Sequence, residues 1–211
     1  FHQPRIVVAD TDTLRTLPRS ELISGLAEAV KHGAIADSEY FDWMLESADS
    51  ILALEPAAIV HLIARSVQIK ADVVGADERE SGPRKILNFG HTIGHAIEAL
   101  SGFELLHGQA IAIGMVVEAR LGEMIGITAP GTGDRLREAL ARFQLPVSIP
   151  LDYAIADILS LTRIDKKARA GAAEYALLEQ IGSVDAAGGR FATRVEDEMV
   201  AAAIEATRAT A

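Results

Sequence analysis

The sequence predicts a mainly α fold: a helical bundle with a short N-terminal strand and a small C-terminal hairpin. Apolar residues recur three and four positions apart over residues 18–35, where Leu22, Leu26 and Val30 form the apolar side of a helix. Residues 107–125 are apolar nearly all round, which indicates a buried central helix. Apolar residues make up 49% of the 211 residues, enough for one sizeable core.

The remaining elements follow from their start and stop signals. A proline suits the first turn of the helix expected over 56–74, and Ser101-Gly102 closes the one expected over 84–100, with a loop over 75–83 between them. Further helices are expected over 39–48, 134–143, 152–161 and from about Glu196 onward. Outside the helices we expect Ile6-Val7-Val8 and Tyr175-Ala176-Leu177-Leu178 as strands, Asp165-Lys166-Lys167 with Gly171 as a loop, and Gly188-Gly189 as a turn.

The composition restricts the class of protein. No stretch approaches the roughly 18 uninterrupted apolar residues of a membrane-spanning helix, and no signal pattern opens the chain, so we expect a cytoplasmic protein without a membrane partner. A formal charge of −10 argues against a nucleic-acid partner. A small anionic ligand stays possible, because a few converging Lys and Arg residues bind one whatever the overall charge. Cysteine is absent, so any metal must be held by His, Asp or Glu.

Residues 84–98 carry the most chemically capable side chains. In a continuous helix, at about 100° per residue, one face would present Arg84, Asn88, His91, His95 and Glu98. Most polar helix faces are simply solvated, but such faces are usually rich in Lys and Glu rather than in His and Asn. Gly90 and Gly94 would cost up to about 1 kcal/mol each in mid-helix, which indicates close approach by a ligand or by another backbone.

Two pairs of residues four apart have the spacing by which one helix face offers two ligands to a metal: His91 with His95, and Glu28 with His32. His107 begins the next expected helix after a short connection, so two antiparallel helices would bring it beside His91. Glu28 lies among apolar residues, where its burial needs a counter-charge such as a metal ion. Spacing alone leaves the membership of the metal site open.

The other polar signals are weaker. His2 and His61 have no chemically suggestive neighbours and are interpreted as surface residues. Gly131-Thr132-Gly133 resembles the beginning of a dinucleotide fingerprint, but no strand precedes it and the third glycine is missing. We therefore interpret it as the start of a helix and not as a cofactor site.

Taken together, several separated motifs resemble the 3-dehydroquinate synthase family over almost the whole chain. The matching segments are Phe1-His2-Gln3-Pro4, Ser24-Gly25-Leu26-Ala27-Glu28-Ala29-Val30-Lys31, Lys70-Ala71-Asp72-Val73-Val74, Asp77-Glu78, Leu87-Asn88-Phe89-Gly90-His91-Thr92-Ile93-Gly94-His95-Ala96-Ile97-Glu98, His107-Gly108-Gln109 and Asp165-Lys166-Lys167. The resemblance implies the C-terminal half of a two-domain enzyme whose α/β half binds NAD. Residues 1–15 would be a strand and linker from that half, and 16–211 the helical metal- and substrate-binding domain.

The resemblance also implies roles for individual residues. It assigns a zinc or cobalt ion to Glu28, His91 and His107, and it assigns His95 to the substrate, for proton handling or phosphate contact. The positions implied to surround the substrate's phosphate, carboxylate and hydroxyl groups are Lys31, Lys70, Arg84, Asn88 and Lys166. The chain departs from the family pattern at Gln109, where the family commonly has glutamate beside the ligand.

The implied reaction belongs to the shikimate pathway. It converts 3-deoxy-arabino-heptulosonate 7-phosphate to 3-dehydroquinate and phosphate, with NAD as a transient oxidant and the metal as a Lewis acid. The partner would be a phosphorylated sugar acid, and the family implies a homodimer.

Three other functions remain open. Related sugar-phosphate cyclases act on heptulose phosphates or glucose 6-phosphate, although Arg84 and Asn88 favour a carboxylated substrate. A metal-dependent alcohol or glycerol dehydrogenase has a comparable helical metal domain but needs fewer cations, and release of phosphate would distinguish the two. A helical binding domain without catalysis is the third, and an upstream coding region for a strand-rich domain with a Gly-rich turn would argue against it.

Overall fold

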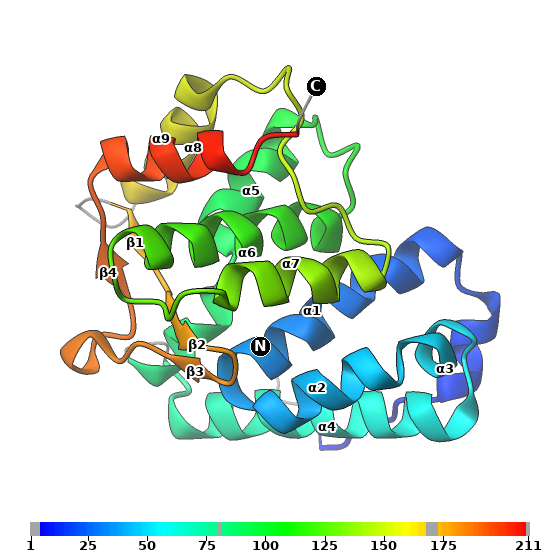
Figure 1. Cartoon of the computed structure of the whole chain (residues 1–211). Helices are drawn as coiled ribbons and strands as arrows, with labels where there is room; N and C mark the ends of the chain where they lie inside the picture. The colour runs from blue at the N-terminus through cyan, green and yellow to red at the C-terminus, as the bar shows by residue number, and fades with distance from the viewer. Residues whose placement is uncertain (1–4, 80–81, 168–172, 210–211) are drawn as a thin grey trace.

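The computed structural model describes residues 5–79, 82–167 and 173–209, with residues 164–167 described by their backbone alone. The described chain is mainly helical, with short strands near its C-terminal end (Figure 1). The α-helices are α1 (Arg19–Ala36), α2 (Ser38–Glu46), α3 (Ala48–Leu52), α4 (Pro56–Ala76), α5 (His91–Leu100), α6 (His107–Met124), α7 (Thr132–Arg142), α8 (Ile155–Lys167) and α9 (Asp197–Ala206). The 3-10 helices are η1 (Thr11–Thr16), η2 (Pro83–Asn88) and η3 (Ala187–Gly189), and the strands are β1 (Glu174–Tyr175), β2 (Leu178–Gln180), β3 (Ser183–Val184) and β4 (Thr193–Arg194).

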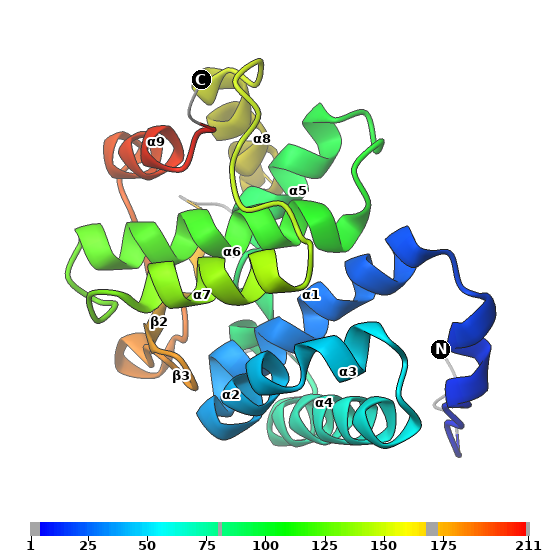
Figure 2. The same ribbon diagram turned by 45° about the vertical axis from the view of Figure 1, so that its right-hand side comes forward.

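Helix α6 is the buried central helix that its apolar sequence predicts. Helices α1, α5, α7 and α9 all pack against it. Ile111 and Met115 of α6 join the apolar cluster of α1, α2, α4 and α7, whereas Ile113 and Val117 join the cluster of α5, α8 and α9. Figures 1 and 2 both show α1 to α4 grouped on one side of α6, and α5, α8 and α9 on the other. A helix that is apolar all round is stable here because both of its sides are covered.

Most predicted helices begin and end near their expected residues. The side chain of Asp37 accepts a hydrogen bond from Tyr40 N, which caps α2 directly after α1 ends. Pro56 occupies the first turn of α4, and Gly131 adopts a left-handed conformation before α7, so Gly131-Thr132-Gly133 does begin a helix. The helix expected over 39–48 is instead divided into α2 and α3 at Ser47.

The prediction of one helix over 84–100 is wrong. Residues 83–88 form η2, Phe89 is extended, and Gly90 has a φ of 81°, so α5 begins only at His91. Close packing against α6 explains the break, because a Cβ built at Gly90 would lie 2.4 Å from Met115 Cγ. At Gly94, within α5, it would lie 3.0 Å from Ile111 Cα. Of the two explanations for these glycines, approach by another backbone is the one observed.

Other differences concern the two ends of the described chain. Residues 6–8 form no strand, and each of them is 79–80% exposed. An isolated strand has no partner for its backbone groups, and none of the described residues pairs with this segment. Residues 165–167, expected in a loop, form the last turn of α8. The C-terminal hairpin is confirmed by the antiparallel pair β2–β3, and β1 pairs with β4.

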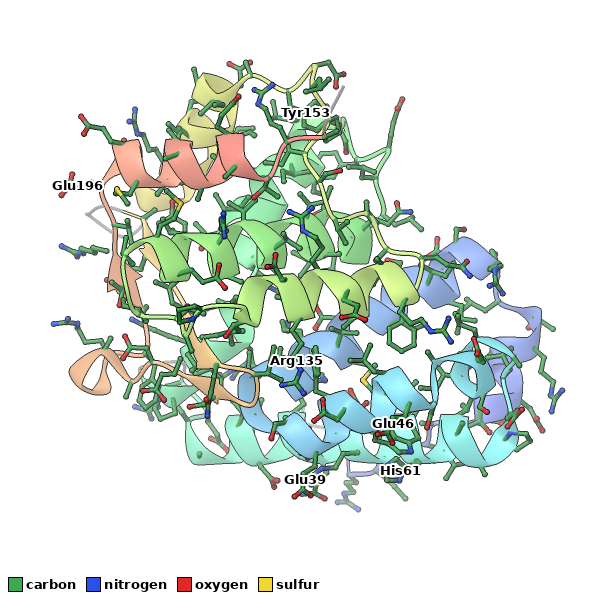
Figure 3. The ribbon with its side chains drawn as sticks, viewed as in Figure 1. Glu39, Glu46, His61, Arg135, Tyr153 and Glu196 are labelled. Carbon is green, nitrogen blue, oxygen red and sulfur yellow. The ribbon has the colours of Figure 1, made fainter. Side chains whose placement is uncertain are left out.

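Side chains on the outer face connect α2 to α7 and to α4. Arg135 of α7 points toward α2 (Figure 3), where it forms an ion pair with Asp42 and lies 5.5 Å from the centre of the Phe41 ring. His61 lies at the exposed side of α4 and contacts Trp43, as expected for a surface residue. None of the described helices has both the length and the apolar character that a bilayer-spanning segment needs.

Candidate active site

Glu28, His91 and His107 meet where α1, α5 and α6 come together. The Oε1 atom of Glu28 lies 3.7 Å from His91 Nε2 and 4.0 Å from His107 Nε2. Each residue is on a different helix, and the packing of α1 and α5 against α6 sets these distances. The three residues that the family resemblance selects are therefore neighbours in space.

His107 reaches Glu28 because α6 begins directly against α1. A Cβ built at Gly108 would lie only 1.9 Å from the carbonyl oxygen of Ser24, so a larger residue would push the two helices apart. Gly108 N also donates a hydrogen bond to Ser24 Oγ at 3.0 Å, one helical turn before Glu28. The departure from the family pattern at Gln109 preserves this helix start, because Gln109 Oε1 accepts from the backbone N–H that precedes His107.

The orientation of both imidazoles suits metal binding through Nε2. His91 Nδ1 lies 3.2 Å from the carbonyl oxygen of Phe89, and His107 Nδ1 lies 3.3 Å from Glu98 Oε2. A carbonyl and a carboxylate only accept hydrogen bonds, so each Nδ1 carries the proton and donates it. The Nε2 lone pairs then remain available on the side of Glu28. Glu98 thus orients His107, a role that spacing did not suggest.

The protonation state of His91 also suits a metal ligand. Burial, followed by the positive charge of Lys31, lowers the pKa of His91 to about 4. The ring is therefore neutral at neutral pH, and a bound metal would not have to displace a proton from it.

His95 lies next to this group. Its ring centre is 5.2 Å from that of His91 and 5.8 Å from that of His107, and one nitrogen from each of the three rings lies within 4.8 Å of the others. Four possible ligands therefore converge. The distances therefore allow a metal ion to be bound either by a set that includes His91 and His95 or by Glu28, His91 and His107.

A cavity of about 200 Å³ adjoins these ligands. It is lined by Glu28, Lys31, His32, Lys70, Arg84, Leu87, Asn88 and His91. Three cations from three separate elements thus face one cavity in a chain whose formal charge is −10. Such a concentration of positive charge suits a ligand with more than one anionic group.

Lys31 is almost completely buried and pairs with both carboxylate oxygens of Glu28. Its Nζ donates to Oε1 at 3.0 Å and to Oε2 at 2.8 Å, and only 2% of the residue is exposed. Burial lowers the pKa of Lys31, and the charge of Glu28 opposes this shift. Burial raises the pKa of Glu28, but the charge and hydrogen bond of Lys31 outweigh it, so the net shift is downward. The carboxylate is therefore held ionised, as a metal ligand must be.

Arg84 is placed by the loop that precedes η2. The buried side chain of Asp77 accepts from Gly82 N at 2.7 Å and from Arg84 N at 3.3 Å. The guanidinium Nη1 donates to the carbonyl oxygen of Glu78 at 2.8 Å. These contacts hold Arg84 in the cavity wall, even though the continuous helix expected over 84–100 does not form.

Most residues predicted for the site are brought together. Glu28, Lys31, Lys70, Arg84, Asn88 and His91 line the cavity, and His95 and His107 adjoin it. The side chain of Lys166 lies outside the described residues, as does the first motif of the resemblance, residues 1–4.

Glu118 was not predicted from the sequence to belong to the site. This residue is completely buried in α6, and its carboxylate accepts from Gly90 N at 2.7 Å and from Ile93 N at 3.2 Å, which caps the start of α5 beside His91. Burial raises the pKa of Glu118 to about 8, against the opposing effect of these N–H groups. An acidic residue inside an otherwise apolar helix was the signal that could have identified it.

Glu118→Gln is expected to destabilise the fold by about 1–3 kcal/mol, because the amide accepts with one oxygen only and leaves a buried N–H unpaired. The affinity for zinc should fall about tenfold, because α5 would hold His91 less firmly. Urea unfolding and zinc titration measure the two effects.

Glu123→Gln is the matched control for Glu118→Gln. Glu123 Oε1 accepts from Gly133 N at 2.9 Å at the start of α7, so this variant makes the same substitution at a helix-capping glutamate away from the candidate ligands. Equal losses of zinc affinity in the two variants would contradict the role assigned to Glu118.

His32 provides a prediction about pH. Burial, followed by the charge of Lys31, lowers its pKa from 6.5 to about 4. Between these values the unfolded chain binds more protons than the folded chain, so stability must fall as the pH decreases from 6.5 toward 4. In EDTA, the free energy of unfolding should therefore drop between pH 7 and pH 5 by about 1–2 kcal/mol more in the wild type than in His32→Asn. His61→Asn, at an exposed position of α4, controls for the loss of an imidazole.

Comparisons with known proteins identify the family and the fold. The family model described as 3-dehydroquinate synthase C-terminal matches residues 25–168, more than half of the chain. Similar folds occur in three solved structures. That of 2-epi-5-epi-valiolone synthase from Streptomyces hygroscopicus subsp. jinggangensis 5008, with NAD+ and Zn2+ bound, is 24% identical with a TM-score of 0.81, over 94% of this chain and 54% of that one.

The other two structures are of 2-deoxy-scyllo-inosose synthase. One, complexed with carbaglucose-6-phosphate, NAD+ and Co2+, is 24% identical with a TM-score of 0.87, over 98% of this chain and 57% of that one. The second is 23% identical with a TM-score of 0.83, over 98% of this chain and 56% of that one. This chain spans little more than half the length of each structure. By its sequence, its helical fold and the match over residues 25–168, the chain belongs to the 3-dehydroquinate synthase C-terminal domain family.

Proposed function

We propose that the chain is the metal- and substrate-binding domain of a 3-dehydroquinate synthase. The reaction would convert 3-deoxy-arabino-heptulosonate 7-phosphate to 3-dehydroquinate and phosphate. The observation that carries the proposal is the convergence of Lys31, Lys70 and Arg84 on a cavity that shares Glu28 and His91 with a cluster of metal-binding side chains. A dehydrogenase acting on a neutral alcohol would not need these cations.

Glu28, His91 and His107 would hold the zinc or cobalt ion. The fit rests on an ionised carboxylate, the neutral imidazole of His91, and the Nε2 atoms of His91 and His107, which lie within 4.0 Å of Glu28 Oε1. With three protein ligands, a metal keeps open positions for substrate oxygens, as catalytic zinc sites do. When bound, the ion would supply Lewis acidity toward neighbouring hydroxyl groups.

The other residues would bind the substrate and handle protons. Arg84, with its planar guanidinium, suits the carboxylate, and Lys31 and Lys70 suit the remaining negative charge. Asn88 can donate to and accept from hydroxyl groups. His95, which is exposed at the edge of the ligand cluster, would exchange a proton with the leaving phosphate or with solvent.

NAD would supply transient oxidation and reduction of the substrate. We propose that it binds mostly outside the described residues. The Gly131-Thr132-Gly133 turn does not suit its phosphates, because the Glu123 carboxylate already accepts from Gly133 N. The chain alone, given NAD, zinc and substrate, should therefore give no turnover.

The rival function is that of a related sugar-phosphate cyclase, which the folds of the two synthases favour. A product assay distinguishes them in the polypeptide in which this chain naturally occurs. With NAD and zinc, 3-deoxy-arabino-heptulosonate 7-phosphate should release phosphate and give 3-dehydroquinate, whereas glucose 6-phosphate and sedoheptulose 7-phosphate should not. Cyclisation of either of the latter, without activity on the carboxylated substrate, would reject the proposal.

A further inference from the structure

His32 has a buried, unpartnered nitrogen beside the site described above. It lies one turn after Glu28 on α1, is 5% exposed, and lines the same cavity as Lys31 and Lys70. Its Nδ1 is 2.6 Å from Ser66 Oγ of α4, whereas its Nε2 has no hydrogen-bond partner in the described part of the chain. An unsatisfied buried nitrogen costs free energy, so a group outside the protein is expected to supply the missing hydrogen bond.

A chain of hydrogen bonds fixes which nitrogen of His32 carries the proton. The Tyr40 hydroxyl donates to the carbonyl oxygen of Leu62 at 2.9 Å, so its oxygen can only accept from Ser66, with which it also hydrogen-bonds. Ser66 has one hydroxyl proton, which this contact uses. The contact between Ser66 and His32 is therefore a donation from Nδ1–H to Oγ, and Nε2 is left with a lone pair.

The surroundings of His32 keep its ring neutral, with Nε2 unprotonated. Lys31, Glu28 and Lys70 are the charged groups that act on it, and burial together with the lysines keeps the ring neutral at neutral pH. A neutral imidazole with Nδ1 protonated is solely an acceptor at Nε2. Phosphate dianions and carboxylates have no proton to donate to Nε2, so these groups suit the neighbouring cations instead. Nε2 suits a part of the ligand that donates a hydrogen bond.

We infer that His32 Nε2 accepts a hydrogen bond from a hydroxyl group of the bound sugar phosphate and so contributes to specificity. The inference rests on the proposed function. In this arrangement Lys31, Lys70 and Arg84 would bind the anionic groups of the ligand, and His32 would bind one of its hydroxyl groups.

Calorimetric titration of the zinc-loaded chain tests the inference with two probes, 3-deoxy-arabino-heptulosonate 7-phosphate and inorganic phosphate. His32→Asn places its amide near the position of Nδ1 and removes Nε2. The sugar phosphate should bind this variant about three- to tenfold more weakly, the effect of one hydrogen bond, while phosphate affinity should be unchanged. His32→Gln, whose amide reaches the position of Nε2, should recover part of the loss.

The outcomes separate the two proposals. If the wild-type chain binds inorganic phosphate but no sugar phosphate, the proposed function fails and the inference fails with it. If the wild type binds the sugar phosphate and His32→Asn binds it equally well, or loses affinity for both probes alike, only the inference is overturned.

A measurement without any substitution adds an independent check. In 15N-histidine spectra of the wild-type chain, His32 should show a protonated Nδ1 and an unprotonated Nε2 at neutral pH. The opposite tautomer would overturn the inference. Ser66→Ala, which removes the acceptor for Nδ1–H, should weaken this preference and lower sugar phosphate affinity without changing phosphate affinity.

Discussion

Glu28→Ala, His91→Ala and His107→Ala should each reduce the bound metal from about one equivalent to almost none. A three-ligand zinc site that loses one ligand keeps too few bonds to compete with water, and the binding free energy of structural zinc sites is of the order of 10 kcal/mol. Metal analysis of the purified, dialysed variants measures the effect. Circular dichroism would confirm that the helices persist.

His95→Ala is the control that decides between the two candidate ligand sets. Its ring lies within reach of both other imidazoles, but the proposal assigns it to the substrate, so this variant should keep its metal. Loss of metal in His95→Ala with retention in Glu28→Ala would assign the site to the three histidines instead. Retention of a full equivalent in Glu28→Ala, His91→Ala and His107→Ala would end the metal proposal.

Lys31→Met should be the most destabilising substitution among the cations of the cavity. It removes the partner of both Glu28 oxygens and leaves that carboxylate half-buried without a counter-charge. In EDTA we expect a loss of about 2 kcal/mol, below the roughly 3–5 kcal/mol for a fully buried pair because 33% of the Glu28 side chain is exposed. With zinc present the loss should be smaller, since Glu28 would then be neutralised by the ion. Urea unfolding in both conditions measures the difference.

Lys70→Met is the matched control, because Lys70 lines the same cavity but is itself exposed. It should leave stability nearly unchanged and weaken the binding of the sugar phosphate. Equal destabilisation by the two substitutions, or a zinc-independent effect of Lys31→Met, would contradict the role assigned to the Lys31–Glu28 pair.

Local signals in the sequence determined most of the helices. The apolar patterns of α1 and α6 and the proline of α4 each act over a few residues, so they can be recognised without knowledge of the fold. Periodicity predicted the wrong structure over residues 84–100, because packing against α6 breaks the helix at Gly90. A pattern of polar residues can continue through Gly90, but the backbone cannot, because Met115 of α6 occupies the space on that side.

The candidate site, like the fold, could be predicted from the sequence only in part. The absence of cysteine limited the ligands to His, Asp and Glu, and four-apart spacing marked Glu28, His32, His91 and His95 as candidates. Spacing within one helix could not choose among them, since the choice depends on which helix lies opposite. The resemblance supplied His107, and the close approach at Gly108 explains how it comes to face Glu28.

The sequence by itself determined a helical, cysteine-free, acidic domain with the residues of a candidate metal and anion site. Only the tertiary structure decided how those residues are held: Lys31 buried against Glu28, Glu98 orienting His107, Glu118 capping α5, and His32 fixed through Ser66. Each of these contacts depends on burial or on a neighbour that packing brings close. Spacing along one helix carries no information about either.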